Sequence, residues 1–327
     1  HSVYIPAKDL EQANEGLEGN FEGIGVQFNI LHDTITVVSP IAGGPSEKLG
    51  IQAGDKIVTI DGELVAGTGI TNKGVADRLR GDKDTKVTVG IKRKGSKKPL
   101  EFVITRDEIP IYSLDAAYMA TDKIGYIKLN RFAKTTMTEF YTAMGSLQEL
   151  GMEDLILDLQ GNGGGMLETS IQLADQFLGA GELIVYTEGR AYPRRDAKAT
   201  AAGTFEKGRL VVLIDEGSAS ASEILAGAVQ DHDRGAIIGR RSFGKGLVQE
   251  QYDLSDGSAL RLTVARYYTP SGRSIQKSYD DIDAYSEEAY NRFKNGELVH
   301  MIERHHIEGR PAELIAENLT EAYNEFC

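Results

Sequence analysis

Three serines at alternate positions open the stretch of this sequence best suited to nucleophilic chemistry. Ser218, Ser220 and Ser222 lie in EGSASASEILAGAVQ, between the apolar run RLVVLID and an apolar helical pattern. Serine caps helix N-termini well, so capping alone explains the pattern. A serine at a strand-to-helix turn can also act as a nucleophile, with backbone N–H groups facing the reacting carbonyl. The stretch by itself leaves both interpretations open.

A serine nucleophile needs a base, and histidine is poorly placed to supply one. The chain has six histidines, at positions 1, 32, 232, 300, 305 and 306. His232, the only one among the helices and strands around the serines, follows the serine helix by roughly ten residues, or ~15 Å. Lys245, in RRSFGKGLVQ, is the better candidate. A lysine accepts a proton only as the neutral amine, which an apolar pocket favours. A solvated loop residue is the alternative interpretation of Lys245.

Two glycine-rich turns could present backbone N–H groups to a ligand. DLQGNGGGMLE lacks both the dinucleotide pattern and the Walker lysine, which argues against a nucleotide site. It is either a tight turn or a helix start whose N–H forms half of an oxyanion hole. In GIGVQF, the N–H groups of Gly23, Ile24, Gly25 and Val26 could bind a carboxylate. The strand that follows them would accept an extended peptide.

The elements around these motifs fall into four regions. Residues 1–19 predict a helical fragment, and residues 20–107 predict an α+β module of short antiparallel strands with two helices. In residues 108–276, strands alternate with helices, which indicates an α/β core with a mostly parallel sheet. Within that core, residues 187–207 are polar and predict a surface excursion or lid. Residues 277–327 predict a charged helical extension.

Composition excludes several classes of protein. The net charge of −13 argues against nucleic-acid binding and against attraction to anionic membranes. The single cysteine, Cys327, permits no intrachain disulfide and no cysteine-based metal cluster. No run of 18 apolar residues is present, so the sequence predicts no membrane span.

The motifs carry two resemblances to known families. SPIAGGPSEKLGIQAGDKIVTIDGE resembles the PDZ domain, with the glycine loop first, as in the permuted form of bacterial proteases. The order GSASASEILAGAVQDHDRG, RRSFGKGLVQ and LSDGSALRLTVARYYTPSGRSIQ resembles the carboxyl-terminal processing peptidases, serine proteases with a Ser-Lys dyad. HSVYIPA and DLQGNGGG extend this resemblance, which runs from His1 to about Gln276. The chain departs from the family at Gln160, where arginine is usual, and in lacking the helical segment before the PDZ domain.

The resemblance implies a fold, a reaction and a set of site residues. The fold would be a PDZ domain plus a crotonase-like α/β peptidase core with a small cap or lid region. The enzyme would bind the free C-terminus of a protein substrate and cleave near it through an acyl-enzyme. It implies these roles: Ser220 as nucleophile, Lys245 as general base, Gln249 as the residue that orients the lysine, Glu223 as accessory, and the N–H groups of Ala221 and Gly165 as oxyanion hole, with Gly164 as the substitute for Gly165.

The same resemblance bears on partners and location. It implies no cofactor and no metal, protein or peptide substrates with free C-termini, and a bacterial envelope location, periplasmic in a Gram-negative cell, with any signal or anchor segment outside this chain. A homodimer and a requirement for an adaptor protein stay open. The competing hypothesis is a catalytically inactive PDZ adaptor or scaffold protein, which the retained Ser220, Lys245 and Gln249 argue against.

Overall fold

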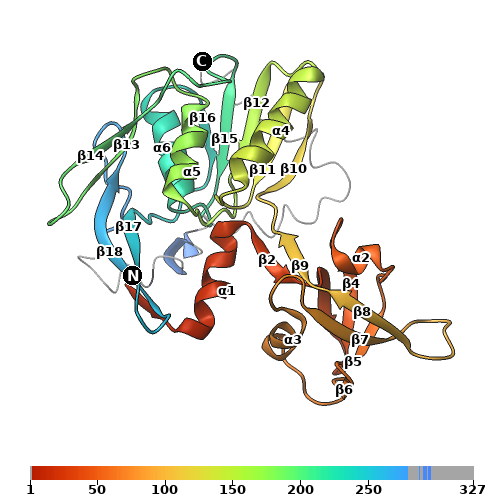
Figure 1. Cartoon of the computed structure of the whole chain (residues 1–327). Coiled ribbons are helices and arrows are strands. Elements are labelled where there is room, and N and C mark those ends of the chain that lie inside the picture. Colours follow the sequence, from red (N-terminus) through yellow and green to blue (C-terminus); the bar gives the residue numbers. More distant parts are fainter. Residues whose placement is uncertain (1, 279–286, 288–289, 293, 296–327) are drawn as a thin grey trace. The chain divides into compact units, whose positions relative to one another are not determined.

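The computed structural model describes residues 2–278, 287, 290–292 and 294–295, and the chain divides into two compact units (Figure 1). The smaller unit is Asn20–Ile111. The larger unit contains His1–Gly19 and the chain from Tyr112 onward. The predicted extension at 277–327 lies almost wholly outside the described residues. No helix in the part of the chain described is long and apolar enough to cross a bilayer.

The smaller unit is the predicted α+β module. Its main sheet has the order β3-β4-β5-β7-β8, with every neighbouring pair antiparallel. Alternate residues of its strands face the core, as at Ile35 and Val37, because side chains of a strand point to opposite faces in turn. The elements are β2 (Asn20–Gly23), β3 (Val26–Ile30), β4 (Ile35–Pro40), α2 (Pro45–Lys48), β5 (Lys56–Ile60), β6 (Glu63–Leu64), α3 (Asn72–Leu79), β7 (Lys86–Lys92), β8 (Leu100–Thr105) and β9 (Asp107–Pro110).

The larger unit is built on a sheet with the order β10-β11-β12-β15-β16, in which β10 alone is antiparallel to its neighbour. Three helices pack against this sheet, and their apolar faces share one core with it. Strand β12 is buried along most of its length, as expected for a parallel strand covered on both faces. The bounds are β10 (Leu114–Met119), β11 (Ile124–Leu129), α4 (Thr136–Glu149), β12 (Asp154–Asp158), α5 (Leu167–Asp175), β15 (Leu210–Ile214), α6 (Ala221–Asp231) and β16 (Ala236–Gly239).

A second sheet of the larger unit packs against α5 and α6. Its order is β1-β18-β13-β14, with β17 also paired to β18. Helix α1 (Ala7–Glu18) follows Pro6 and ends at Gly19, whose left-handed conformation closes the helix. The strands are β1 (Val3–Ile5), β13 (Leu183–Glu188), β14 (Arg195–Lys198), β17 (Leu247–Asp253) and β18 (Ala259–Tyr268).

The segment 187–207 is more ordered than its polar sequence indicates. Its first residues end β13, and β14 pairs back onto β13 as an antiparallel hairpin. Phe205 is buried in the main core, and Thr200 bonds to the Asp175 carboxylate through both its N–H and its hydroxyl. The segment predicted as a surface excursion or lid therefore contains the end of β13 and the edge strand β14, followed by a stretch that packs against the core at Phe205.

Candidate active site

Two turns meet at the carboxyl ends of β12 and β15 in the larger unit, because these strands are parallel neighbours. The first turn is the glycine turn after β12, and the second is the serine turn between β15 and α6. Several hydrogen bonds join them: Gly161 N–H donates to Asp215 Oδ1 at 2.8 Å, and Ala219 N–H donates to the Asn162 carbonyl at 3.0 Å. The sheet topology thus places the two motifs singled out in the sequence side by side.

The three serines of the second turn have different environments. Ser218 and Ser222 are fully buried, and their hydroxyls donate to the carbonyls of Leu159 and Asn162, both at 2.8 Å. Ser220 is only half-buried and has φ 56° and ψ −109°, a conformation that non-glycine residues rarely adopt. Such strain costs of order 1–3 kcal/mol and persists where the surrounding structure imposes it, often at functional sites.

Glu223 holds the serine turn and the lysine loop together. Its side chain is buried in the first turn of α6 and accepts four hydrogen bonds. Oε2 accepts the N–H groups of Ser220 and Lys245, both at 2.8 Å. Oε1 accepts the N–H of Gly244 at 2.6 Å and the hydroxyl of Ser242 at 2.7 Å. One carboxylate therefore fixes the backbone of both the candidate nucleophile and the candidate base.

The glycines on either side of Lys245 allow a neighbouring segment to approach closely. Gly244 has φ 88°, and a Cβ there would lie 2.4 Å from Lys277 Cγ. A Cβ on Gly246 would lie 2.3 Å from the Gln276 backbone nitrogen. The Lys277 N–H donates to the Gly244 carbonyl at 3.0 Å, and this hydrogen bond holds the loop that contains Lys245 against the neighbouring segment. Side chains at either glycine would displace the lysine.

Two N–H groups beside Ser220 are left without protein partners. The N–H of Ala221, the first residue of α6, donates to none of the residues described, as expected at a helix start. The Gly165 N–H likewise has no acceptor in the described part of the chain. The Gly164 N–H, in contrast, donates to Asn162 Oδ1 at 2.9 Å. A Cβ on Gly164 would lie 2.9 Å from the Ala221 nitrogen, so the glycine turn and the start of α6 are in contact.

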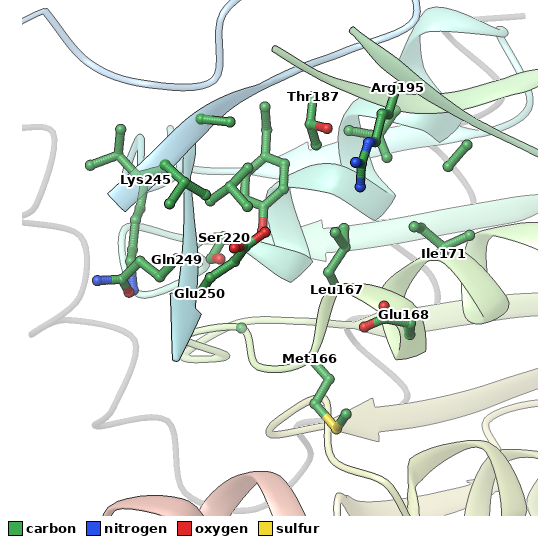
Figure 2. Close-up of a pocket in the computed structure, with 18 of the residues that line it drawn as sticks. Met166, Leu167, Glu168, Ile171, Thr187, Arg195, Ser220, Lys245, Gln249 and Glu250 are labelled. Atoms are coloured by element: carbon green, nitrogen blue, oxygen red, sulfur yellow. The ribbon is translucent and has the colours of Figure 1, made fainter. Parts of the chain in front are cut away.

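Ser220, Lys245, Gly164 and Gly165 line one pocket of about 750 Å³ in the larger unit. Ser220, Lys245 and Gln249 lie at one end of it in Figure 2, and Thr187 and Arg195 at the other. The Lys245 Nζ forms no ion pair with the residues that the structure describes. The pocket wall includes these apolar and aromatic residues: Leu167, Ile171, Val185, Ala197, Leu247, Val248 and Tyr267. Burial, reinforced by Glu168, raises the pKa of Tyr267 to about 12.

His232 takes no part in the pocket. It caps the C-terminus of α6, and its Nε2 lies 2.7 Å from the Leu183 carbonyl oxygen. Nor do the described residues contain a group of three or more histidine, cysteine, aspartate or glutamate side chains that could hold a metal ion. Among the residues that line the pocket with Ser220, Lys245 is therefore the candidate base that the sequence singled out.

A cluster of two tyrosines and a glutamate ties the β13–β14 hairpin to β17. The hydroxyls of Tyr192 and Tyr252 donate to Glu250 Oε2 at 3.0 and 2.6 Å, and the two hydroxyl oxygens lie 2.9 Å apart. The hydrogen bonds from Tyr252 and then Tyr192 lower the pKa of the Glu250 carboxyl below its ordinary value. The same contacts raise the pKa of Tyr252. The cluster holds the hairpin wall of the pocket in place.

Asn162 is a site residue that the sequence analysis did not single out. Its buried side chain donates to the Leu129 carbonyl at 2.8 Å and accepts the Gly164 N–H. Its own carbonyl accepts bonds from Ala219 and Ser222. An asparagine within a glycine turn was the available signal, because its side chain readily bonds to nearby backbone.

The glycine loop of the smaller unit leads into a strand at the edge of its sheet. The N–H groups of Ile24 and Gly25 donate to no described residue, and Gly25 has φ 71°. The strand that follows, β3, lies at the edge of its sheet and has a free side. A shallow pocket runs beside it, lined by Phe28, Asn29, Ile30, Leu31 and Asn72, the first residue of α3. Gly23 ends β2 and pairs with Asp107 of β9.

Comparison with known proteins finds a matching family model for each of the two units. The model of Peptidase family S41 matches residues 123–284, and that of the PDZ domain matches residues 23–104. A solved structure, the photosystem II D1 C-terminal processing protease, is 33% identical with a TM-score of 0.50, covering 84% of this chain and 75% of that one. The chain belongs to peptidase family S41. The predicted fold class, a PDZ domain plus an α/β peptidase core, is therefore confirmed.

Curated relatives carry names of the same kind. The carboxy-terminal-processing protease of Bartonella bacilliformis is 41% identical over 283 residues, which are 84% of this chain and 64% of that protein. The carboxyl-terminal-processing protease of a Synechocystis species is 38% identical over 264 residues, 79% of this chain and 61% of that protein. The chain thus spans a little over three fifths of these relatives. A third model, described as disulphide isomerase, matches residues 273–327, which include the only cysteine.

Proposed function

We propose that this protein is a serine endopeptidase that cleaves protein substrates near their C-termini, with Ser220 as nucleophile and Lys245 as general base. The observation that carries the proposal is the Glu223 carboxylate, which accepts the N–H groups of both Ser220 and Lys245 at 2.8 Å. It fixes the two reacting residues in the wall of one pocket. The names of the relatives in family S41 support the same activity.

The reaction follows from the groups present. Ser220 Oγ attacks the carbonyl carbon of the scissile bond while Lys245 Nζ, as a neutral amine, takes the hydroxyl proton. The oxyanion that forms accepts hydrogen bonds from the N–H groups of Ala221 and Gly165, for which the described residues supply no acceptor. The C–N bond then breaks as Lys245 returns the proton to the leaving amine. Water hydrolyses the ester on Ser220 with Lys245 again as base.

The surroundings of Lys245 support its role as a base. No carboxylate of the described residues lies within ion-pair distance of Nζ, so none stabilises the ammonium form by direct contact. The residues that follow it in the pocket wall, Leu247 and Val248, are apolar. Gln249 lies on strand β17, four residues after Lys245, and lines the same pocket. We assign it to orienting the amine of Lys245.

The PDZ unit is assigned to reading the free C-terminus of the substrate. The N–H groups of Ile24 and Gly25 suit a carboxylate, and β3 offers its free edge to an extended peptide. Location in the bacterial envelope belongs to the proposal as well and rests on the family resemblance alone.

The test is cleavage of a protein substrate by the wild-type protein and by Ser220→Ala, with mass spectrometry of the products. The proposal predicts fragments shortened at the C-terminus in the wild type and none with the variant. Amidation of the substrate's C-terminus should lower cleavage by tenfold or more, since hydrogen bonds to a charged group contribute about 1.5–3 kcal/mol and 1.4 kcal/mol is tenfold. Binding of the substrate without cleavage by either protein would favour the inactive adaptor instead.

A further inference from the structure

The register of the β13–β14 hairpin turns one arginine toward the pocket. Arg195 pairs with Thr187, and Ala197 pairs with Val185. Residues that face each other across two antiparallel strands project from the same side of the sheet. All four line the pocket that contains Ser220, and Figure 2 shows the Arg195 guanidinium pointing into it.

The neighbouring arginine belongs to the opposite face and is already engaged. Arg194 Nε donates to Asp196 Oδ1 at 2.7 Å, and its guanidinium lies 3.7 Å from the centre of the Tyr186 ring. Asp196 pairs with Tyr186 across the hairpin and also lines the pocket, whereas Arg194 does not line it. The two adjacent arginines thus have different roles in the hairpin.

Arg195 has no partner at ion-pair distance in the part of the chain that the structure describes. Neither an ion pair nor a side-chain hydrogen bond joins it to a described residue. The carboxylate of Glu250, which also lines the pocket, accepts hydrogen bonds from Tyr192 and Tyr252. The charge of Arg195 acts on it from beyond contact distance and adds to these bonds in lowering its pKa. Another pocket arginine, Arg261, is bonded to Asn14 and Gln251. Arg195 therefore brings to the pocket a guanidinium whose hydrogen-bond donors no described side chain uses, in a chain of net charge −13.

We propose that Arg195 is a specificity-determining residue that binds a carboxylate of the substrate while Ser220 attacks the scissile bond. This inference rests on the proposed peptidase function and adds a substrate class to it. The planar guanidinium matches a carboxylate in a two-pronged arrangement, which a lysine could not reproduce. Two sources supply such a carboxylate: an acidic side chain close to the cut, or the α-carboxylate of a chain that ends a few residues beyond it.

A substrate carboxylate also suits the rest of the pocket. The pocket that contains Ser220 and Arg195 has apolar lining residues, among them Leu167, Ile171 and Val185, so a short peptide segment can bury uncharged side chains there. Glu168, on the first turn of α5, lines the same pocket and disfavours acidic groups near it. The preference is therefore expected at one substrate position, the one that Arg195 reaches, and not across the whole peptide.

The experiment uses quenched-fluorescence peptides based on a cleavage site found with the wild-type protein. The peptides are acetylated at the N-terminus and amidated at the C-terminus. Glutamate replaces glutamine at one position at a time, from three residues before the cleaved bond to three after it. The quantity measured is the ratio of kcat/KM for glutamate to that for glutamine at each position. A second pair, with a free-acid or amidated end three residues after the cut, tests the α-carboxylate. The proteins are the wild type, Arg195→Gln, Arg195→Glu and the matched control Arg194→Gln.

The inference predicts a ratio of about ten at one position, or for the free-acid peptide over its amide. Arg195→Gln should bring that ratio to about one, Arg195→Glu should bring it below one, and Arg194→Gln should keep it. Because each ratio is internal to one protein, a general loss of activity does not alter it. Which peptide pair shows the effect identifies the source of the carboxylate.

Ratios within twofold of one throughout the wild-type series would overturn the inference while leaving the peptidase function intact. A preference that Arg195→Gln retains would overturn it equally. If neither the wild type nor Ser220→Ala cleaves any substrate, the peptidase function fails first and the inference fails with it.

Discussion

Replacing Glu223 by glutamine tests whether one carboxylate positions both reacting residues. The substitution keeps the shape of the side chain but turns one acceptor oxygen into an NH₂ donor. The least costly orientation places the NH₂ at the Oε1 position, where the Ser242 hydroxyl can reverse and accept. The Gly244 N–H then faces a donor and loses its partner. The N–H groups of Ser220 and Lys245 keep an acceptor, but an uncharged one.

The expected energy follows from these four bonds. A hydrogen bond to a charged group contributes about 1.5–3 kcal/mol and a neutral one about 1 kcal/mol. Losing the Gly244 bond and weakening the other two N–H bonds sums to about 2.5–7 kcal/mol of unfolding free energy. A shift of about 1 Å in a reacting group costs about 10²-fold in rate, so kcat/KM should fall at least that far.

The assay combines urea unfolding with kcat/KM on a peptide substrate. Glu216→Gln is the matched control, because Glu216 lies in the same turn and pairs with Arg240 without contacting Ser220 or Lys245. The control should lose stability but keep kcat/KM within about threefold. Ser242→Ala, which removes one bond and leaves the carboxylate charged, should fall between the two. A Glu223→Gln protein with wild-type kcat/KM would refute the positioning role.

Three further predictions concern the base, the glycine turn and pH stability. Lys245→Arg should be as inactive as Lys245→Ala, because arginine keeps the charge but does not lose its proton; an arginine variant with much of the wild-type rate would exclude the general-base role. Gly164→Ala should lower kcat by 10²-fold or more, since its Cβ would lie 2.6 Å from the Ala219 carbonyl oxygen. Gly161→Ala, which has a similar positive φ but open space around it, should cost about 1 kcal/mol of stability and little activity; equal kcat values would contradict this. Burial alone would raise the pKa of Asp231, but hydrogen bonds from Thr269, Ser271 and Arg273 outweigh it and hold that pKa at about 2. Asp231→Asn should therefore lower the unfolding free energy by about 2 kcal/mol at pH 6, a difference that shrinks as pH falls from about 4 to 2 and that urea titrations at both ends would measure.

The elements that sequence predicts well are those with local signals. Alternating β-branched residues identify the strands of the PDZ unit, and the helical spacing after Ser220 identifies α6. Strand β14 could not be found in this way, because RDAK has little strand propensity and is extended only through pairing with β13. The segment 187–207 therefore looked irregular in sequence and is a hairpin in the structure.

The same distinction between local signals and long-range contacts applies to the candidate site. A serine before a helix and a lysine between glycines are visible as types and spacing, and they line one pocket. The role of Glu223 as a four-bond acceptor was not visible, since three of its partners lie 19 to 22 positions away, and neither was that of Asn162. Such contacts depend on the register of parallel strands, which no local pattern encodes.

The most direct test of the central claim is to find the residue that a fluorophosphonate probe modifies. The probe reacts with an activated serine, and digestion followed by mass spectrometry locates the adduct. Ser218 and Ser222 are internal controls, because both are buried and hydrogen-bonded two positions away. The account predicts a single adduct on Ser220 that Lys245→Ala abolishes. An adduct on another serine, or peptide cleavage that persists in Ser220→Ala, would contradict it.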